Sequence, residues 1–541
     1  MNRFDRLPHI AARYQRRRTL YEGTGLWPTS TLQRAFLDAL ATKPGQEWTF
    51  VTAGVPVKLT LGELGAAASS FAARLAASSA ASADDVLAIV LPNSAGAVTS
   101  FFGAQLIGLT GFPTSMREGR ESMRELFERV GVAHVVLDQD DATRREWIDE
   151  FIANGLVKEV WLADVHGNIR TGRTQAHPPE EGRQPELPET IDGVHLIAYT
   201  SGSTSEPKIV LHTDAELLAE SHSLAEVFGH FDTMLVAAPI GHITGILHLL
   251  TLPLVRDGDV VSIDRWEVDA ALEACRTFGA ETLAGTSLYF QQMFDRDAAM
   301  GGVKGGIAGG GPVAPVIVQR AERESGIKIV RSYGSTEHPT ISQSLPTDVL
   351  EKRALTDGSL NLGVEVRIID PLGGDVPIGA SGEILSRGPD AMAGYLDPEL
   401  DAETYTTDGW FHTGDVGVID DAGFLTITDR IKDLIIRAGE NISAKEVEDI
   451  IQEWSEVVEV AVVGIPDPQY GERACAFVLS RNSQLDLDGL RKYLATTRLE
   501  RFKWPERVVL VGDFPRTPSG KVRKKELRDS WEPLGTDSVP S

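Results

Sequence analysis

Short apolar runs rich in β-branched residues recur along the first two thirds of the chain. The clearest of these strand candidates are 133–139, 156–164, 234–240, 259–264 and 327–334. Between them, apolar residues return every third or fourth position, which is the spacing of helices with one buried face. The alternation predicts layers of helices on largely parallel sheets.

The pattern changes after about residue 360. Residues 362–370 and 381–387 alternate apolar and polar positions, as half-exposed antiparallel strands do. Residues 415–430 contain two such strands around an Asp-Ala-Gly turn, which predicts a hairpin. Ser443, followed three residues later by Glu446, predicts a helix N-terminus with a capping box.

The length of 541 residues is too great for one ordinary core. After the hairpin, enough strand and helix remain for a compact domain of about 110 residues. We therefore predict a mixed α/β chain. Residues 1–430 form a large domain of layered α/β subdomains, 434–541 form a small α+β domain, and the boundary between them lies at 431–433.

Composition narrows the class of partner. The chain is 42% hydrophobic and 24% charged, as globular proteins are, and its net charge is −26. That charge argues against nucleic acid or an anionic membrane surface as the main partner. No stretch reaches the roughly 18 uninterrupted apolar residues of a membrane span. The nearest, from Val86, is broken at 92–94 and predicts a strand, a turn and a helix.

Cysteine and histidine usage gives no metal site. Cys275 and Cys475 lie 200 positions apart, which supports neither a zinc site nor a disulfide framework and predicts a reducing, cytoplasmic setting. The 12 histidines show no paired ligand spacing. Residues 1–20 are basic but lack the Ser-rich, acid-free composition of a transit peptide. The sequence does not determine the oligomeric state, and a homodimer is the commonest assembly among soluble proteins that form oligomers.

The stretch "YTSGSTSEPKIV", residues 199–210, concentrates hydroxyls before a single cation. Ser and Thr compete for backbone hydrogen bonds and Gly202 loosens the chain, so the run predicts a loop between a buried strand and the helix expected within 212–228. Converging N–H groups and hydroxyls, with Lys208, suit an anion. The plainer interpretation is a solvated Ser/Thr linker. Neither G-x-x-x-x-G-K-[ST] nor G-x-G-x-x-G is present here.

Five motifs together resemble a known family. They are "TSGSTSEPK" (200–208), "YGSTE" (333–337), "HTGD" (412–415), "DRIKDLIIRAGENIS" (429–443) and "PRTPSGKVRKKEL" (515–527). In order and separation they resemble the adenylate-forming superfamily, which contains acyl-CoA synthetases, firefly luciferase and peptide-synthetase adenylation domains. The likeness extends from about residue 50 to 530. It implies that ATP activates a carboxylic acid as acyl-AMP with release of pyrophosphate, and that CoA then takes the acyl group.

The resemblance also implies the residues that bind ATP. Asp415 and Arg430 would hold the ribose, Tyr333 would lie flat against adenine, and three glycines would let the backbone approach the base. Ser205 replaces the usual glycine of the phosphate loop, which costs on the order of 1 kcal/mol if that position needs a positive φ. The full implied set is Thr200, Ser201, Gly202, Ser203, Thr204, Lys208, Gly309, Gly310, Gly311, Tyr333, Gly334, Ser335, Thr336, Asp415, Arg430 and Lys521.

Catalytic and metal roles follow from the same resemblance. Lys521 would reach the α-phosphate as negative charge grows there. Glu337, with Thr204, would hold Mg²⁺, because a hard dication prefers oxygen ligands. Thr200 and His242 complete the implied catalytic set. Taken singly, each has a plainer interpretation: Lys521 as part of a solvated charge run, and His242 as a core histidine.

The implied acyl pocket is mostly apolar and offers no Lys or Arg to a second carboxylate. We therefore expect an apolar monocarboxylic acid of medium size, with a chain, a ring or an aromatic group. The pocket residues are His242, Ile243, Gly245, Tyr289, Gly334 and Ile341.

The resemblance further implies that 1–430 include a β-barrel-like subdomain, and that 431–433 form a hinge about which the mobile domain 434–541 turns for the second step. In the family, the C-terminal domain rotates at the position of Lys432, so that the strand around Arg437 faces the site and Gly439 leaves room for the pantetheine arm of CoA. One alternative is transfer to a separate carrier protein. The other is a silent nucleotide-binding homologue, against which the retained Lys521, Glu337 and Asp415 argue.

Overall fold

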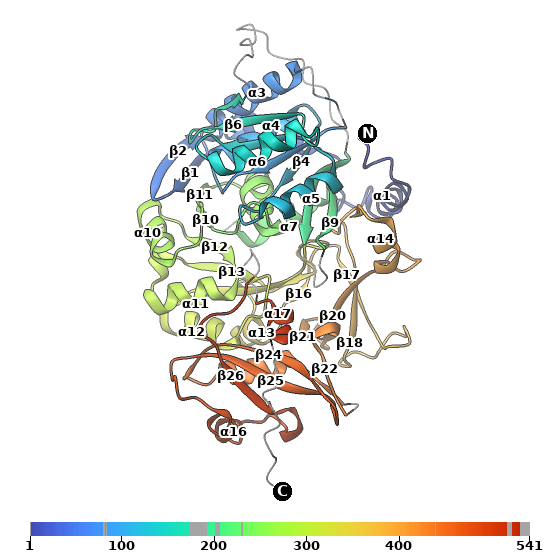
Figure 1. Ribbon diagram of the computed structural model, residues 1–541, viewed down its shortest axis with the longest axis vertical. Helices are drawn as coiled ribbons and strands as arrows, with labels where there is room; N and C mark the ends of the chain where they lie inside the picture. The colour runs from blue at the N-terminus through green and yellow to red at the C-terminus, as the bar shows by residue number, and fades with distance from the viewer. Residues whose placement is uncertain are drawn as a thin grey trace.

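The computed structural model describes residues 2–78, 82, 84–172, 192–200, 206–228, 231–438, 440–516 and 522–530. Figure 1 shows a large N-terminal domain of α/β layers and a small C-terminal domain that follows β21. The predicted mixed α/β class, with one large and one small domain, is confirmed.

Sheet A, one of two large sheets in the described part of the chain, has nine strands, and the six from β14 to β1 are parallel. Their spatial order is β16 (Ser359–Leu360), β15 (Ser342–Gln343), β14 (Lys328–Tyr333), β13 (Gly305–Gly309), β12 (Thr282–Gly285), β10 (Thr233–Val236), β11 (Asp259–Ile263), β1 (Glu47–Thr52) and β2 (Val55–Thr60).

Sheet B has eight strands, with antiparallel pairs at both of its edges. Its order is β19 (Gly394–Tyr395), β9 (Lys208–Thr213), β8 (Val194–Thr200), β4 (Thr110–Pro113), β3 (Val86–Val90), β5 (Val132–Asp138), β6 (Glu159–Ala163) and β7 (Ile169–Thr171). All five strand candidates of the alternating region therefore contain strands, namely β5, β6, β10, β11 and β14.

Helices cover both faces of each large sheet. A shared apolar core joins the two sheets through α2 (Leu32–Thr42), α3 (Leu61–Ala77), α4 (Ala95–Leu106), α7 (Asp214–Phe228), α8 (Ile243–Ile246) and α9 (Leu252–Val255). The outer face of sheet B carries α5 (Arg120–Val130) and α6 (Ala142–Ala153), and that of sheet A carries α10 (Val268–Phe278), α11 (Ser287–Arg296) and α12 (Pro315–Ser325). Further helices are α1 (Pro8–Tyr21), α13 (Leu350–Leu355) and α14 (Pro398–Thr404).

The stretch from Val86 that came nearest to a membrane span is β3, a turn and α4, as predicted. Every residue of α4 is buried, because the helix lies between the two sheets. A Cβ on Gly103 would lie 2.5 Å from the Phe71 ring, so glycine permits this close packing. None of the helices in the described ranges is long and apolar enough to cross a bilayer.

Sheet C occupies the region for which a β-barrel-like subdomain was predicted, but it is an open antiparallel sheet in the order β17 (Glu365–Ile369), β18 (Gly382–Arg387), β20 (Phe411–Ile419) and β21 (Leu425–Arg430). Its last pair is the predicted hairpin. Sheet D builds the C-terminal domain from β23 (Glu440–Ile442), β22 (Ile435–Arg437), β25 (Gly471–Ser480), β24 (Val457–Asp467) and β26 (Arg507–Leu510). Around it pack α15 (Ala444–Gln452), α16 (Leu487–Leu494) and α17 (Lys524–Asp529).

Two local predictions need correction. The stretch at 200–208 does not join a strand to a helix: β8 and β9 form an antiparallel pair, with Thr200 opposite Lys208, and α7 begins only at Asp214. The capping box at Ser443 is half formed. Ser443 Oγ accepts the Glu446 N–H at 3.0 Å, but the Glu446 carboxylate binds Lys503 instead of returning to the cap.

Candidate active site

The carboxyl-terminal edge of sheet A brings together residues that are distant in the sequence. Gly309 ends β13, Tyr333 ends β14, His242 follows β10, and Tyr289 follows β12 in α11. Because these strands are parallel, their carboxyl ends meet at one edge, the usual position of ligand sites in α/β sheets.

A tight turn after β14 orients Glu337. A Cβ on Gly334 would lie 2.0 Å from the carbonyl oxygen of Pro339, so this position requires glycine. The Ser335 hydroxyl accepts the Glu337 N–H at 3.2 Å and the His338 N–H at 3.3 Å. The motif "YGSTE" is therefore a compact turn that ends in a buried carboxylate.

Tyr395 fixes that carboxylate, and the sequence analysis missed it. Its hydroxyl donates to Glu337 Oε1 at 2.6 Å, and burial together with the Glu337 charge raises the pKa of Tyr395. Tyr395 lies on β19, opposite Val210 of β9, and the Lys208 ammonium lies 5.4 Å from its ring centroid. One tyrosine thus connects the end of the predicted phosphate loop with the predicted metal residue.

Glu337 has the chemistry expected for a magnesium position. Its Oε1 accepts the Tyr395 hydrogen, and no donor from the described residues reaches Oε2. The described ranges contain no cluster of three or more His, Cys, Asp or Glu that could hold a metal. A single carboxylate fits Mg²⁺ that takes its other ligands from phosphates and water.

A second cluster joins sheets A and C. Asp415 lies opposite Arg430 in the β20–β21 hairpin, and Arg430 Nε contacts Asp415 Oδ1 at 2.9 Å. The Tyr333 hydroxyl donates to Asp415 Oδ2 at 2.8 Å. The Asp415 charge raises the pKa of Arg430, and burial followed by that charge raises the pKa of Tyr333. The three residues predicted to hold the nucleoside are therefore in direct contact.

Of the three predicted base-binding glycines, two meet a backbone requirement. Gly310 has φ +74°, and a Cβ on Gly309 would lie 2.8 Å from the carbonyl oxygen of Ser332. A Cβ on Gly311 would meet no atom within 4 Å.

The predicted acyl residues lie at the same edge. Ile243, Gly245, Tyr289 and Ile341 are buried, whereas His242 is partly exposed and accepts the Thr244 N–H at 3.3 Å as the cap of α8. A π-helical turn follows at Leu247–Thr251, a distortion frequent near functional sites. Tyr289 stacks on Trp266 with ring centroids 3.7 Å apart, a contact between distant residues that no local pattern predicts.

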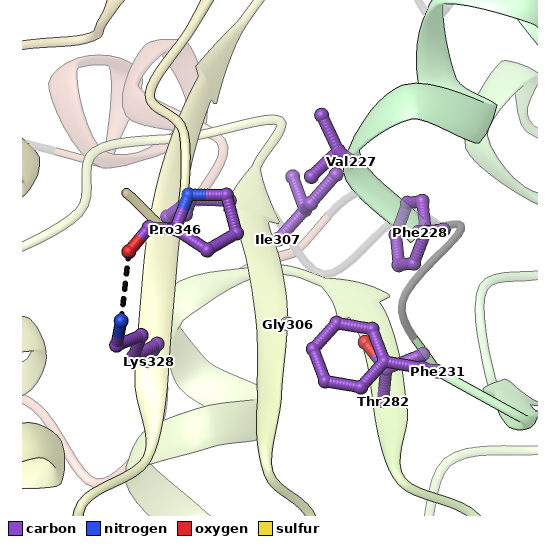
Figure 2. Close-up of a pocket in the computed structure, with 9 residues that line it drawn as sticks. Val227, Phe228, Phe231, Thr282, Gly306, Ile307, Lys328 and Pro346 are labelled. Carbon is purple, nitrogen blue, oxygen red and sulfur yellow. Dashed lines mark hydrogen bonds between the residues drawn. The ribbon is translucent and has the colours of Figure 1, made fainter. Parts of the chain in front are cut away.

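Figure 2 shows a cavity that is not the candidate site. Its volume is about 10 Å³, and it lies at the amino ends of β12, β13 and β14, where Lys328 Nζ donates to the Pro346 carbonyl oxygen at 3.0 Å. Thr282 Oγ1 has no hydrogen-bond partner among the described residues. Roughly 10–15 Å³ holds one water molecule, so this cavity is too small for a substrate.

Several predicted residues lie outside the described ranges: Ser201, Gly202, Ser203, Thr204, Ser205, Gly439 and Lys521. The positions beside Lys521 are well anchored. Val522 forms a β-bridge with Arg516, Arg516 contacts Glu459, and Lys524 Nζ pairs with Glu448 at 2.7 Å. Arg516, Val522 and Lys524 are therefore attached to the body of the C-terminal domain.

The predicted hinge residue lies near both clusters, because the charges of Lys208, Arg430 and Asp415 act on Lys432. Lys432 is exposed in the turn Ile431–Asp433. Arg437 pairs with Glu506 at 2.9 Å and lies 4.4 Å from the Tyr470 ring centroid, so it is held inside the C-terminal domain.

A buried acid pair lies behind the turn. Glu220 of α7 lies within reach of the Asp390 charge, Asp390 contacts His338 Nε2 at 3.1 Å, and Thr340 donates to Glu220. Burial and the Asp390 charge raise the pKa of Glu220 well above its usual value, so Glu220 stays protonated where an unfolded glutamate is ionised. The folded chain then binds one proton more, and this group destabilises the fold as pH rises.

We expect Glu220→Gln to reduce the fall in thermal midpoint between about pH 5 and pH 9, because the amide cannot lose a proton there. Thermal unfolding followed across that range measures the effect. Glu226→Gln, on the exposed face of the same helix, is the matched control. Parallel curves for Glu220→Gln and the unmodified protein would contradict the assignment of a neutral Glu220.

Comparison with known proteins identifies the family. A family model described as "AMP-binding enzyme" matches residues 37–396, and one described as "AMP-binding enzyme C-terminal domain" matches residues 446–521. The chain belongs to the AMP-binding enzyme family. The predicted superfamily is confirmed, and the class of this AMP-binding enzyme is that of the AMP-forming acyl-CoA synthetases.

Several relatives of this AMP-binding enzyme are acid–CoA ligases. A medium-chain fatty-acid–CoA ligase of Escherichia coli (strain K12) is 33% identical over 346 residues, 62% of this chain and 61% of that protein. A 2-succinylbenzoate–CoA ligase of Enterococcus faecalis is 32% identical over 401 residues, 73% of this chain and 80% of that protein. Among solved structures, ATP-bound MatB from Rhodopseudomonas palustris is 25% identical with a TM-score of 0.81, covering 94% of this chain and 100% of that one.

Proposed function

We propose that this enzyme joins an apolar monocarboxylic acid to CoA in two steps. In the first, a carboxylate oxygen of the acid attacks the α-phosphorus of ATP, the bond from that phosphorus to the bridging oxygen breaks, and pyrophosphate leaves. In the second, the CoA sulfur attacks the acyl carbon, AMP leaves, and the thiol proton passes to solvent. The observation that carries the proposal is the Lys208–Tyr395–Glu337 cluster, in which Glu337 closely follows β14, the strand of sheet A that ends at Tyr333.

The two clusters support a division of roles along ATP. Lys208 and Glu337 stand at the phosphate end, with residues 200–208 as the proposed phosphate loop. Mg²⁺, when bound by Glu337 with Thr204, neutralises phosphate charge there. Asp415 retains unused lone pairs for ribose hydroxyls, although each of its oxygens already accepts one donor. Arg430 holds Asp415 in place from the hairpin.

Asp415→Asn is expected to raise the KM for ATP roughly 10- to 100-fold, because hydrogen bonds to a charged group contribute about 1.5–3 kcal/mol. The KM for the acid should change little, since the acyl residues lie after other strands. Asp421→Asn, at the exposed turn of the same hairpin, is the control. An unchanged KM for ATP in Asp415→Asn would remove Asp415 from the nucleotide site.

The C-terminal domain is proposed to serve both steps by rotating about residues 431–433, with 1–430 and 434–541 as the two bodies. One pose brings Lys521 to the α-phosphate, and the other brings Arg437 and Gly439 to the acyl-AMP. The exposed Lys432 and the internal pairing of Arg437 with Glu506 are compatible with a domain that moves as a unit.

The apolar residues at the sheet edge support a monocarboxylic substrate of medium size. The medium-chain fatty-acid–CoA ligase is consistent with that choice. The 2-succinylbenzoate–CoA ligase acts on a diacid, so a substrate panel must include both kinds. We further propose a cytoplasmic enzyme, in keeping with the free, buried thiols Cys275 and Cys475, and a homodimer.

The test is ATP–pyrophosphate exchange with linear, branched, cyclic and aromatic acids, followed by addition of CoA or of a phosphopantetheinylated carrier protein. The proposal expects exchange with apolar monocarboxylic acids and thioester formation with CoA. Strong preference for a dicarboxylate would contradict the proposed substrate, and acyl transfer to the carrier alone would contradict the acceptor. Absence of exchange with every acid would favour the silent homologue.

A further inference from the structure

The N-terminal helix α1 lies outside the residues matched by the family model, yet it contacts the segment that carries Tyr395. Figure 1 shows α1 beside α14 and β9. His9, Arg13 and Arg17 are spaced four residues apart, so they project from one face of the helix. We call these three side chains the donor ladder of α1, and we call residues 389–395, which they face, the strip.

Each donor of the ladder reaches a carbonyl oxygen in residues 389–395. His9 Nε2 contacts the carbonyl oxygen of Tyr395 at 2.9 Å, and Arg13 Nη1 donates to that of Ala393 at 2.8 Å. Arg17 donates to the carbonyl oxygens of Met392 at 2.9 Å and of Pro389 at 2.8 Å.

The strip held by this ladder donates two hydrogen bonds to Glu337. The Met392 N–H donates to the Glu337 carbonyl oxygen at 2.7 Å, and the Tyr395 hydroxyl donates to Glu337 Oε1 at 2.6 Å. A shift of the strip would therefore move both the backbone and the carboxylate of the proposed magnesium residue.

A second route leads from Arg17 to the same turn. Arg17 Nη1 pairs with Glu216 Oε1 at 2.9 Å, Glu216 Oε2 contacts His212 Nδ1 at 3.1 Å, and His212 Nε2 contacts the carbonyl oxygen of Thr336 at 2.9 Å. The exposed fractions of Arg17, Glu216 and His212 are only 5%, 1% and 0%. Water therefore cannot replace these contacts, and the route ends one residue before Glu337.

We propose that α1 is a positioning element of the active site, and that Arg17 is its principal residue, setting Glu337 and Tyr395 toward the metal-bearing end of ATP. The inference rests on the proposed function of Glu337. A planar guanidinium suits the task, because its five donors can bind one carboxylate and two carbonyl oxygens at fixed angles. Lysine at this position would keep the positive charge but would lose the fixed, planar arrangement of donors.

The experiment compares Arg17→Ala and Arg17→Lys with Arg18→Ala, because the Arg18 side chain is exposed and forms its ion pair with Glu22, the residue that follows α1. Exchange is measured against free Mg²⁺ and against the acid, and calorimetry measures binding of a non-hydrolysable ATP analogue with and without Mg²⁺. For Arg17→Ala we expect about a 10-fold rise in the Mg²⁺ needed for half-maximal exchange and a matching loss of the Mg²⁺-dependent part of analogue binding. Arg17→Lys should lie between, and Arg18→Ala should match the unmodified enzyme.

The inference is overturned if Arg17→Ala leaves the Mg²⁺ dependence of exchange and the binding of the analogue unchanged. It is also overturned if Arg17→Ala raises the acid and the Mg²⁺ concentrations needed for half-maximal exchange by the same factor. Should Arg17→Ala not fold, His9→Ala removes one rung of the ladder, and the same two criteria apply to a smaller expected shift. The proposed function is tested beforehand by the unmodified enzyme. If that enzyme shows no Mg²⁺- and acid-dependent exchange, the proposed function fails whatever the variants do.

Discussion

Replacing Lys521 by alanine is expected to lower acid-dependent ATP–pyrophosphate exchange by about 100- to 1,000-fold, the usual effect of removing one group that stabilises charge in a transition state. Negative charge grows on the α-phosphate oxygens as the acid attacks, and Lys521 is the cation proposed to meet it. The binding of ATP should weaken far less, because the phosphate loop, Glu337 and Asp415 remain.

Lys525→Ala is the matched control for this change. Lys525 lies four residues further on, exposed in α17. Its loss removes the same charge from the same segment and should leave exchange unchanged. Full exchange by Lys521→Ala, or equal losses in both variants, would show that the C-terminal domain acts through its general charge and brings no specific lysine to the phosphate.

Glu337→Gln should lower exchange by at least about 100-fold at moderate Mg²⁺, because an amide oxygen is a much weaker ligand for a hard dication than a carboxylate. The substitution keeps the size of the side chain and leaves an oxygen to accept the Tyr395 hydroxyl. The fold around "YGSTE" should therefore survive, as near-ultraviolet circular dichroism and the thermal midpoint can verify.

Exchange measured over a range of Mg²⁺ concentrations separates a metal role from a structural one. Part of the lost rate should return at high Mg²⁺ in Glu337→Gln. Glu351→Gln, on the exposed surface of α13, should behave as the unmodified enzyme. A rate loss in Glu337→Gln that no Mg²⁺ concentration relieves, with an unchanged affinity for Mg²⁺, would contradict the assignment.

Much of the fold could be predicted from local patterns. The five apolar runs become strands because their length and composition suit burial on both faces, and the 415–430 hairpin forms around its turn residues. The loop at 200–208 was misread because "KIVLHT", residues 208–213, directly precedes a helical pattern. Its identity as strand β9 depends on pairing with β8 and β19, which no local pattern reveals.

The candidate site, too, could be predicted from the sequence only in part. Glu337, Asp415 and Arg430 lie in motifs whose residue types and order carry the resemblance, so they could be named from the sequence. Tyr395 lies on a two-residue strand, and Arg17 lies in the basic segment 1–20, whose composition was compared only with that of a transit peptide. Their roles depend on contacts across 58 residues to Glu337 and across 199 residues to Glu216.

Transfer of oxygen from the acid to AMP tests the central claim most directly. The enzyme is incubated with ATP, CoA and a carboxylic acid labelled with ¹⁸O in both oxygens, and the products are examined by mass spectrometry. The account predicts one labelled oxygen in AMP and one in the acyl-CoA, because an acid oxygen becomes the bridge to phosphorus. Unlabelled AMP, or ADP formed in its place, would contradict it.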